Sequence, residues 1–361
     1  MPDWRIVFAL SFVIVTLGTD LLVHRRQRLR ASRGADAWDP RRRQLRPEVA
    51  RALGPLPIDD YLAPCVVAAV HVQLLLLAAL VGWFGHPIAA GAAACVLAAT
   101  RLRALQEVTH YAVHGTLTAR RGTGLAVAAW LFQFPFGRAT IEARAKHHVQ
   151  EHHPHVNDPA RDPNLIEYVE LGFNPPLRGP AFLRLAFFPV TPRGLAATVR
   201  STWAHLRAAP VPIVVAASLL VGALTLVGGA TAAAVCYAIP LFVVYPLLSW
   251  WSQLVEHRWF RSRPASGIDR EYVSGRVLNV SRFTRWCLEA SVLPFGDSLH
   301  LAHSMYPGIR WNHLGFVHAV HMERDSEYRA VALDVVWWPG SARSIVGDVF
   351  RNFSQTPVAG S

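Results

Sequence analysis

Long apolar segments, separated by polar or basic stretches, dominate the chain from its first residues. A transmembrane helix needs roughly 20 predominantly apolar residues, and a run of roughly 18 with few charges already indicates one. One such segment lies near the N-terminus and four more follow it. The predicted spans are residues 6–23, 62–84, 88–105, 211–228 and 230–251. The pattern therefore predicts an all-α, polytopic membrane protein with about four to five transmembrane helices.

Two details refine this arrangement. Residues 125–136 are apolar over only 12 positions, which predicts an interfacial or re-entrant piece because such a segment is too short to cross a bilayer. Near the end of the third span, Arg101 and Arg103 interrupt the apolar pattern. Long basic side chains at a helix end extend toward the membrane surface, and we expect both arginines to do so.

The N-terminal apolar segment has two interpretations. A cleaved signal peptide would start with net positive charge and end at a site of small residues. Here Asp3 offsets Arg5, and ten Lys and Arg residues follow the segment, between positions 25 and 51. This pattern favours an uncleaved anchor whose basic side lies in the cytoplasm and contacts anionic lipid.

Composition agrees with a membrane protein. Hydrophobic residues make up 52% of the chain and charged residues only 17%, against about a quarter in an average soluble domain. The net charge of +12 sits beside apolar runs, so anionic lipid is favoured over nucleic acid as its partner. The cysteines form no CxxC pair, which argues against a disulfide framework or a structural zinc site. They are Cys65, Cys95, Cys236 and Cys287.

Histidine is the unusual residue, with 17 copies in four main clusters. Helical residues three or four positions apart share a face, and this spacing occurs in "HYAVH", in "HHVQEHH" and in "HLAH". His153 is adjacent to His152, so one of the two should face a different metal or an orienting partner. A further histidine ends "QLVEH". The candidate metal ligands are His110, His114, His148, His152, His153, His257, His300 and His303.

Eight imidazoles are too many for one metal ion, because a zinc site takes three or four protein ligands. Imidazole binds iron, zinc, copper and nickel. Two adjacent metals with about four nitrogens each fit the number. A redox-active dinuclear iron site at the membrane surface is the interpretation that uses every ligand.

The order H-x3-H, H-x3-HH and a late H-x2-H resembles the membrane fatty acid desaturase superfamily. The stretches "HHPHVNDPARDPN" and "GDSLHLAHSMYPGIRW" resemble the regions around its second and last boxes, and the resemblance covers roughly residues 60–330. It implies a cytoplasmic cap that holds two irons above a transmembrane stalk, with a hydrophobic tunnel for an acyl chain. It also implies that the eight histidines are iron ligands, that the reaction needs no other catalytic residue or cofactor, and that Gln253 holds a water on one iron.

One position departs from the family pattern. The last box of the family usually ends H-x2-HH, and Ser304 stands at its final position here. Either one iron keeps an open or water-filled site, or another residue substitutes. The nearby candidates are His313, His318 and His321, and the pair His318 and His321 is the first to test. A more open iron would favour oxygen insertion over desaturation.

Several carboxylates could orient the predicted ligands. Glu256 precedes His257, and Asp158 and Asp162 follow the second cluster. Either aspartate could accept an N–H from a ligating imidazole. The alternative is that the segment is an Asx-turn loop held by Pro159 and Pro163.

Charge bias and the spans set a topology. If the basic loop is cytoplasmic, the following two pairs of spans each lead out and back, so every histidine cluster and the C-terminus lie on the cytoplasmic side. We expect an N-terminal anchor with a basic loop over residues 1–60, a desaturase-like membrane domain over 61–330 and a C-terminal tail over 331–361.

The implied activity is O2-dependent desaturation of an acyl chain. Hydroxylation, ketolation and oxidative decarboxylation use the same scaffold and stay open. A membrane zinc hydrolase or metal transporter is the alternative from another class, although a hydrolase should contain an HExxH pair, which "HYAVH" is not. The chain contains no nucleotide-binding glycine loop and no evident haem or iron–sulfur motif. A separate electron donor is therefore expected, either a ferredoxin or a cytochrome with its reductase, and the basic surface suits an acidic donor.

Overall fold

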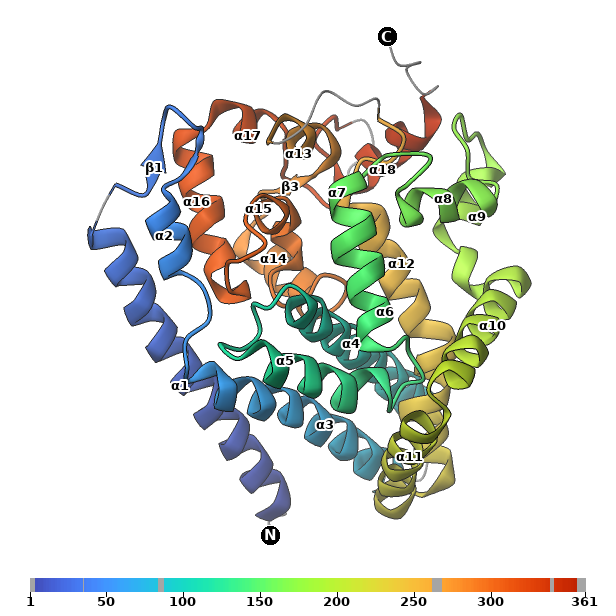
Figure 1. Ribbon diagram of the computed structural model, residues 1–361. Coiled ribbons are helices and arrows are strands. Elements are labelled where there is room, and N and C mark those ends of the chain that lie inside the picture. The colour runs from blue at the N-terminus through green and yellow to red at the C-terminus, as the bar shows by residue number, and fades with distance from the viewer. Residues whose placement is uncertain (1–3, 35, 84–87, 262–267, 338–340, 356–361) are drawn as a thin grey trace.

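The computed structural model describes residues 4–34, 36–83, 88–261, 268–337 and 341–355. It has an apolar lower layer of long helices and an upper cap of shorter ones (Figure 1). The prediction of a mainly helical chain is confirmed. The long helices are α1 Trp4–Gly34, α3 Asp59–Trp83, α4 Ile88–Val113, α10 Pro192–Ala208, α11 Pro210–Ala233 and α12 Tyr245–Glu256.

The cap is built from short helices and two small strand pairs. β1 Trp38–Asp39 pairs with β2 Gln44–Leu45, and β3 Val277–Leu278 pairs with β4 Ala332–Leu333. The cap helices are α2 Pro47–Ala52, α8 Pro163–Glu170, α9 Pro180–Ala186, α13 Ile268–Ser274, α14 Arg282–Glu289, α15 His300–Met305, α16 Leu314–Arg324, α17 Ser326–Ala330 and α18 Ile345–Ser354. A helical arm links cap and lower layer, with α6 Ile141–Ala145, a π-helical segment Lys146–His152 and α7 His153–His155.

Three helices in the described part of the chain are long and apolar enough to cross a membrane. They are Asp59–Trp83, Ile88–Val113 and Pro210–Glu256. The first two match predicted spans, although position 84 lies outside the described residues. The third holds both later spans in 47 residues, and Gly229 divides it with φ 82° and ψ 171°. The predicted N-terminal span lies within α1, and the total number of spans stays a prediction.

The short apolar segment forms two short helical elements, and its place in the membrane stays a prediction. It forms α5 Arg121–Ala128 and the π-helical turn Ala129–Gln133, and α5 packs along α4.

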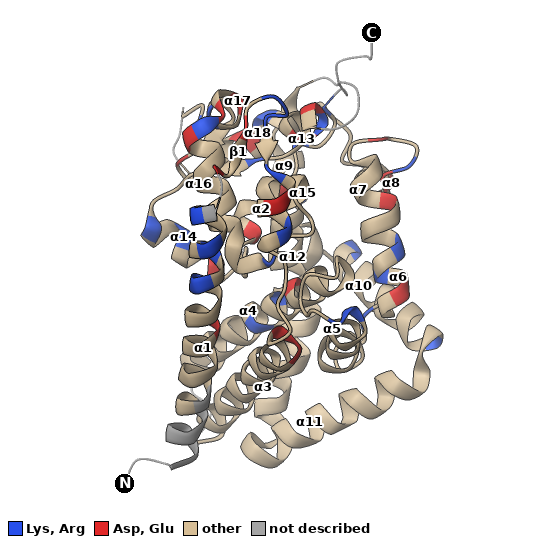
Figure 2. Ribbon diagram, turned by 60° about the vertical axis from the view of Figure 1, so that its left-hand side comes forward, with Lys and Arg blue, Asp and Glu red and all other residues tan. Residues whose placement is uncertain are grey.

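Charged side chains gather over the cap, and the lower helices carry few (Figure 2). Large apolar side chains such as Leu219 and Leu226 are exposed on the lower layer, which fits immersion in lipid.

Two glycines let α3 and α11 approach closely. A Cβ on Gly228 would lie 2.1 Å from the carbonyl oxygen of Ala78, and one on Gly82 would lie 3.0 Å from Gly228. Small residues at helix contacts allow such packing in membranes. The contact fixes the long helix that carries Glu256 at its far end.

We expect Gly228→Ala to destabilise the protein by about 1–3 kcal/mol, because the added methyl would overlap backbone atoms of α3. Gly222→Ala is the matched control in the same helix, since nothing lies within 4 Å of its added Cβ. Thermal unfolding in detergent measures both. Equal melting temperatures for the two variants would contradict the close approach.

The last predicted segment joins the cap. β4 lies parallel to β3, and α18 buries Val349 and Phe353 completely. Leu177 donates its backbone N–H to the carbonyl of Phe353 at 2.7 Å. Residues up to 354 therefore pack against the cap, and the domain boundaries stay a prediction.

Candidate metal centre

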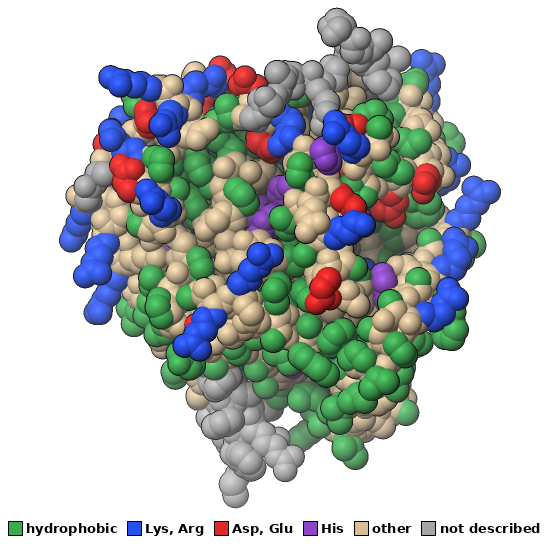
Figure 3. Space-filling view, in the orientation of Figure 1, with side chains coloured by type: hydrophobic (Ala, Val, Ile, Leu, Met, Phe, Trp, Pro, Cys, Tyr) green, Lys and Arg blue, Asp and Glu red, His purple; other side chains and the backbone are tan. Residues whose placement is uncertain are grey.

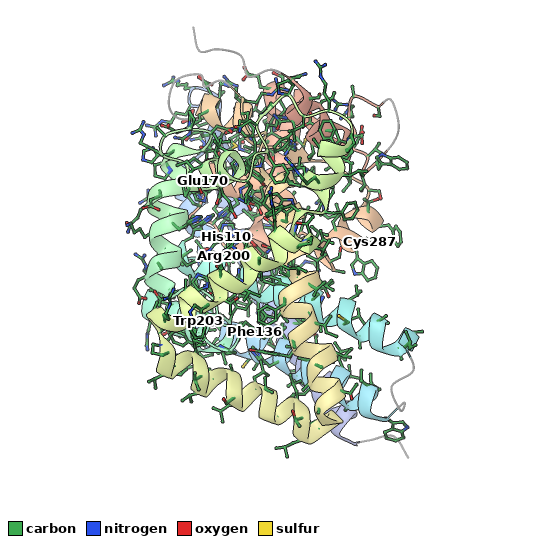
Figure 4. The ribbon with its side chains drawn as sticks, turned by 90° about the vertical axis from the view of Figure 1, so that its right-hand side faces the viewer. His110, Phe136, Glu170, Arg200, Trp203 and Cys287 are labelled. Atoms are coloured by element: carbon green, nitrogen blue, oxygen red, sulfur yellow. The ribbon has the colours of Figure 1, made fainter. Side chains whose placement is uncertain are left out.

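His110 lies between the cap and the lower helices (Figure 4). The other predicted ligands gather near it in two groups. Histidine atoms are visible between basic and apolar side chains on one face of the upper half (Figure 3). Five of the eight predicted histidine ligands each offer a ring nitrogen, and these five nitrogens all lie within 4.8 Å of one another. We call this set the five-histidine group: His110, His114, His148, His153 and His303.

The other three predicted ligands meet around His257. Its Nε2 lies 3.2 Å from Nε2 of His152 and 3.1 Å from Nε2 of His300. We call these residues the three-histidine group. The structure thus brings all eight predicted ligands together, but divides them unequally between two centres.

The backbone of the second cluster explains that division. Residues Lys146–His152 form a π-helix, in which each turn closes on the fifth residue and not the fourth. His148 and His153 therefore share a face, with their Nε2 atoms 3.2 Å apart. Nε2 of His152 points to the other group, although its ring stacks on that of His148 with centroids 5.6 Å apart. The two rings lie side by side as their spacing predicts, but they belong to different groups.

A helix end places His257. α12 ends at Glu256, and His257 is extended with φ −126° and ψ 154°. Arg276, which is 1% exposed, donates to the carbonyl oxygens of Leu254 and His257. A cation that caps the last carbonyls stabilises a helix C-terminus. His257 therefore stands just beyond the end of the helix that carries Gln253.

Burial prepares these rings for a metal. It lowers the pKa of His114, His148, His153, His257 and His303 well below the ordinary value. A neutral imidazole is the form that binds a metal. Nε2 of His114 is buried with no partner among the described residues. The residues present therefore fit two metal ions.

Carboxylates orient three of the rings. Nδ1–H of His152 donates to Asp162 at 2.9 Å, that of His110 donates to Glu107 at 2.7 Å, and that of His300 contacts Asp297 at 3.3 Å. Such contacts fix the ring and leave Nε2 for the metal. Glu107 and Asp297 were not predicted, although each lies three residues before its histidine, a spacing that shares a helical face.

Arg103 joins these carboxylates in the interior. It is fully buried and donates to Glu107 at 2.5 Å and to Asp297 at 2.6 Å. Glu256 lies 3.8 Å away and bonds Ser252. The expectation that Arg103 extends to the membrane surface is wrong, because its carboxylate partners lie inside the protein.

The buried carboxylates also shift the pKa of His300 and of Asp297. Burial lowers the pKa of His300, but Glu256 and Asp297 outweigh it and raise that pKa to about 9. Burial, with Glu107 and Glu256, raises the pKa of Asp297 to about 6 despite Arg103. The buried network therefore holds an excess of negative charge, which favours cations at the centre.

Other predicted residues lie elsewhere. Asp158 accepts from the backbone N–H of Ala160 and from Arg161, as a loop-holding residue does. Gln253 lines a separate polar cavity of about 290 Å³. The three candidates to replace the missing histidine belong to neither group in the described structure. Nδ1 of His313 bonds the carbonyl of Leu53, Nδ1 of His318 contacts the hydroxyl of Tyr328, and Nε2 of His321 contacts that of Tyr306.

We expect Asp162→Asn to lower the metal affinity of the three-histidine group about 10–100-fold, because a neutral amide orients His152 less firmly. Asparagine can still accept from the N–H of Asn164, so α8 keeps its cap. Loss of metal to a chelator measures the effect. Asp158→Asn in the same loop is the control, and equal loss from both variants would contradict the assignment.

Comparison with known proteins decides the family. The model of the family "Fatty acid desaturase" matches residues 86–335. The chain belongs to the fatty acid desaturase family. The match spans both histidine groups, and membership in a desaturase family implies an oxidoreductase with a lipid or acyl substrate in a membrane. Among curated proteins, none matches the chain significantly.

Proposed function

We propose that this desaturase family member is an O2-dependent di-iron enzyme that converts a CH2–CH2 pair of an acyl chain into a double bond. The observation that carries the proposal is the pair of buried histidine groups, with a carboxylate orienting a ring in each. Imidazole suits iron. Two bound irons would supply the activation of O2 that an unactivated C–H bond requires.

An apolar cavity supports an acyl substrate. A cavity of about 330 Å³ opens between α1, α3, α4, α14 and the segment after α14, and Leu17, Val70 and Trp286 are among its lining residues. A narrower cavity shares Phe295 with it and reaches Tyr111. The ring of Tyr111 stacks on His110 with centroids 5.3 Å apart. A chain in this cavity would reach the five-histidine group from the apolar side.

The side chains around the groups have defined parts in this reaction. Glu107 and Asp162 accept the Nδ1–H of a ligating ring and hold it in place. The apolar walls exclude water from the reacting carbons. One O2 takes two hydrogens from the chain, and two electrons and two protons from outside, and leaves as two waters.

The electrons require a separate donor, for which we propose a ferredoxin or a cytochrome with its reductase. The net charge of +12 supports an acidic partner. We place the cap and the C-terminus on the cytoplasmic side, because the arginines between positions 25 and 33 of α1 lie toward the cap end of that helix.

Fatty acid analysis tests this function. The chain is expressed in a bacterial host with a ferredoxin and its reductase, with His152→Ala as the inactive control. We expect a product lighter by two hydrogens that is absent from the control. A product heavier by one oxygen would contradict desaturation and identify a hydroxylase.

A further inference from the structure

The three-histidine group offers a metal fewer protein ligands than the five-histidine group does. His257 lies between His152 and His300, so three nitrogens face a metal there against five in the other group. Iron in oxygen-activating enzymes commonly combines imidazole with carboxylate ligands. A further buried side chain would therefore complete the coordination of a metal held by the three-histidine group.

Ser304 lies on the face of α15 that carries His300. It follows His300 by four residues on α15 and therefore lies on the same helical face. Its Oγ is buried without a partner among the described residues. A cavity of about 230 Å³ lies beside it, lined by Ser304, Met305 and Tyr306 from one side and by Arg270 and Glu271 of α13 from the other.

Backbone contacts hold α13 against the group. Gly275 forms an antiparallel bridge with His257, and the N–H of Arg258 donates to the carbonyl of Ser274 at 2.6 Å. Leu301 fills the space beside Gly275, where an added Cβ would lie 2.6 Å from its Cδ1. The end of α13 is thus fixed next to His257 and to the residue after His300.

Glu271 brings a carboxylate into this space. The residue is 8% exposed and accepts from Arg270 at 2.9 Å. Arg270 in turn donates to the carbonyl of Pro154, directly after the second histidine cluster. Burial raises the pKa of Glu271, while Arg270 and then His300 and His152 oppose that shift. A buried carboxylate of this kind is stabilised by a further cation.

Glu256 is a further carboxylate near this group, and its partners differ from those of Glu271. It lies close to nitrogens of His257 and His300, but it bonds Ser252 and faces Arg103. Those contacts place it in the network that includes Asp297, which holds Nδ1 of His300. Glu256 is therefore held by Ser252 and Arg103, whereas Glu271 lines the cavity beside Ser304.

We propose that the carboxylate of Glu271 is the fourth protein ligand of the three-histidine metal, in the position where Ser304 leaves space. The assignment rests on the proposed di-iron function. Glu271 and Ser304 line the same cavity, so the carboxylate is available on that side. The two irons would then differ in kind, with only nitrogen ligands from the protein on one and a carboxylate on the other.

Iron content and Mössbauer spectra of the purified, 57Fe-labelled protein test the proposal. We expect wild type to hold about two irons with distinct spectra, and Glu271→Ala to hold about one. Adding Ser304→His to Glu271→Ala should restore the second iron, because an imidazole then fills the same space. Glu289→Gln is the control, since this cap glutamate accepts from Ser298 outside both groups and should keep both irons.

Glu271→Asp separates a ligand from a structural role if Glu271→Ala does not fold. The shorter side chain keeps the charge and should alter the spectrum of one iron only. Two irons with unchanged spectra in Glu271→Ala, or in Glu271→Asp, would overturn the proposal and leave the di-iron function standing. Wild-type protein with zinc and no iron would overturn the function itself.

Discussion

Replacing His257 by alanine is expected to abolish activity, with product formation reduced at least about 100-fold. Loss of a group that merely orients a ligand already costs roughly 10–100-fold, and His257 is the central member of its group, with Nε2 3.2 Å and 3.1 Å from its two neighbours. Without it, two imidazoles remain at that metal. We therefore expect about one iron to be lost.

The matched control is His155→Ala. His155 lies in the same histidine-rich stretch as three predicted ligands but belongs to neither group. Activity is measured as product formed with an excess of reduced electron donor, and iron by elemental analysis. A His257→Ala variant with wild-type activity would contradict the assignment of its group, and so would an equal loss in His155→Ala.

Replacing Arg103 by methionine is expected to destabilise the protein by about 3–5 kcal/mol, the usual effect of removing one partner from a buried ion pair. Arg103 is fully buried and contacts Glu107 and Asp297, which hold His110 and His300. Without the guanidinium these carboxylates would repel one another. Both irons should consequently be held more weakly.

Arg101→Met is the control for this change. Arg101 lies two residues earlier on α4, is half-buried and bonds Gln73 and the carbonyl of Ala290. We expect a small effect there. Thermal unfolding in detergent and iron content distinguish the variants, and wild-type stability in Arg103→Met would refute a role for Arg103 in holding the centre.

The sequence predicted the helical architecture because apolar run length alone determines which segments can cross a bilayer. α3 and α4 match their predicted spans, and Gly229 breaks the last pair where expected. The close contact of α3 and α11 could not be predicted, because it depends on which helix faces bring Gly82 and Gly228 together. No single segment carries that information.

The eight candidate ligands could be selected from their spacing, but their division could not. A regular α-helix places His148 with His152, whereas the π-helix places His148 with His153. His257 lies beyond its helix, where Arg276, 19 residues further along the chain, caps the preceding carbonyls. Sequence spacing assumes regular backbone, and metal sites often depart from it.

The buried carboxylate network had a signal that sequence reasoning can use. Glu107 and Asp297 each precede a histidine by three residues, as expected of groups that orient a ring from one helical turn away. Arg103 stands within a predicted span, where an ionisable residue is a functional candidate by default. The long, charged side chain of Arg103 would equally suit a position at the membrane surface. Only the fold shows that the side chain is buried.

Metal analysis of the purified wild-type protein tests the central claim most directly. Elemental analysis gives the metal and its stoichiometry, and Mössbauer spectroscopy of 57Fe-labelled protein distinguishes the two environments. The account predicts about two irons per chain, one for each histidine group. About one zinc per chain without iron would contradict it and indicate a hydrolytic metal site.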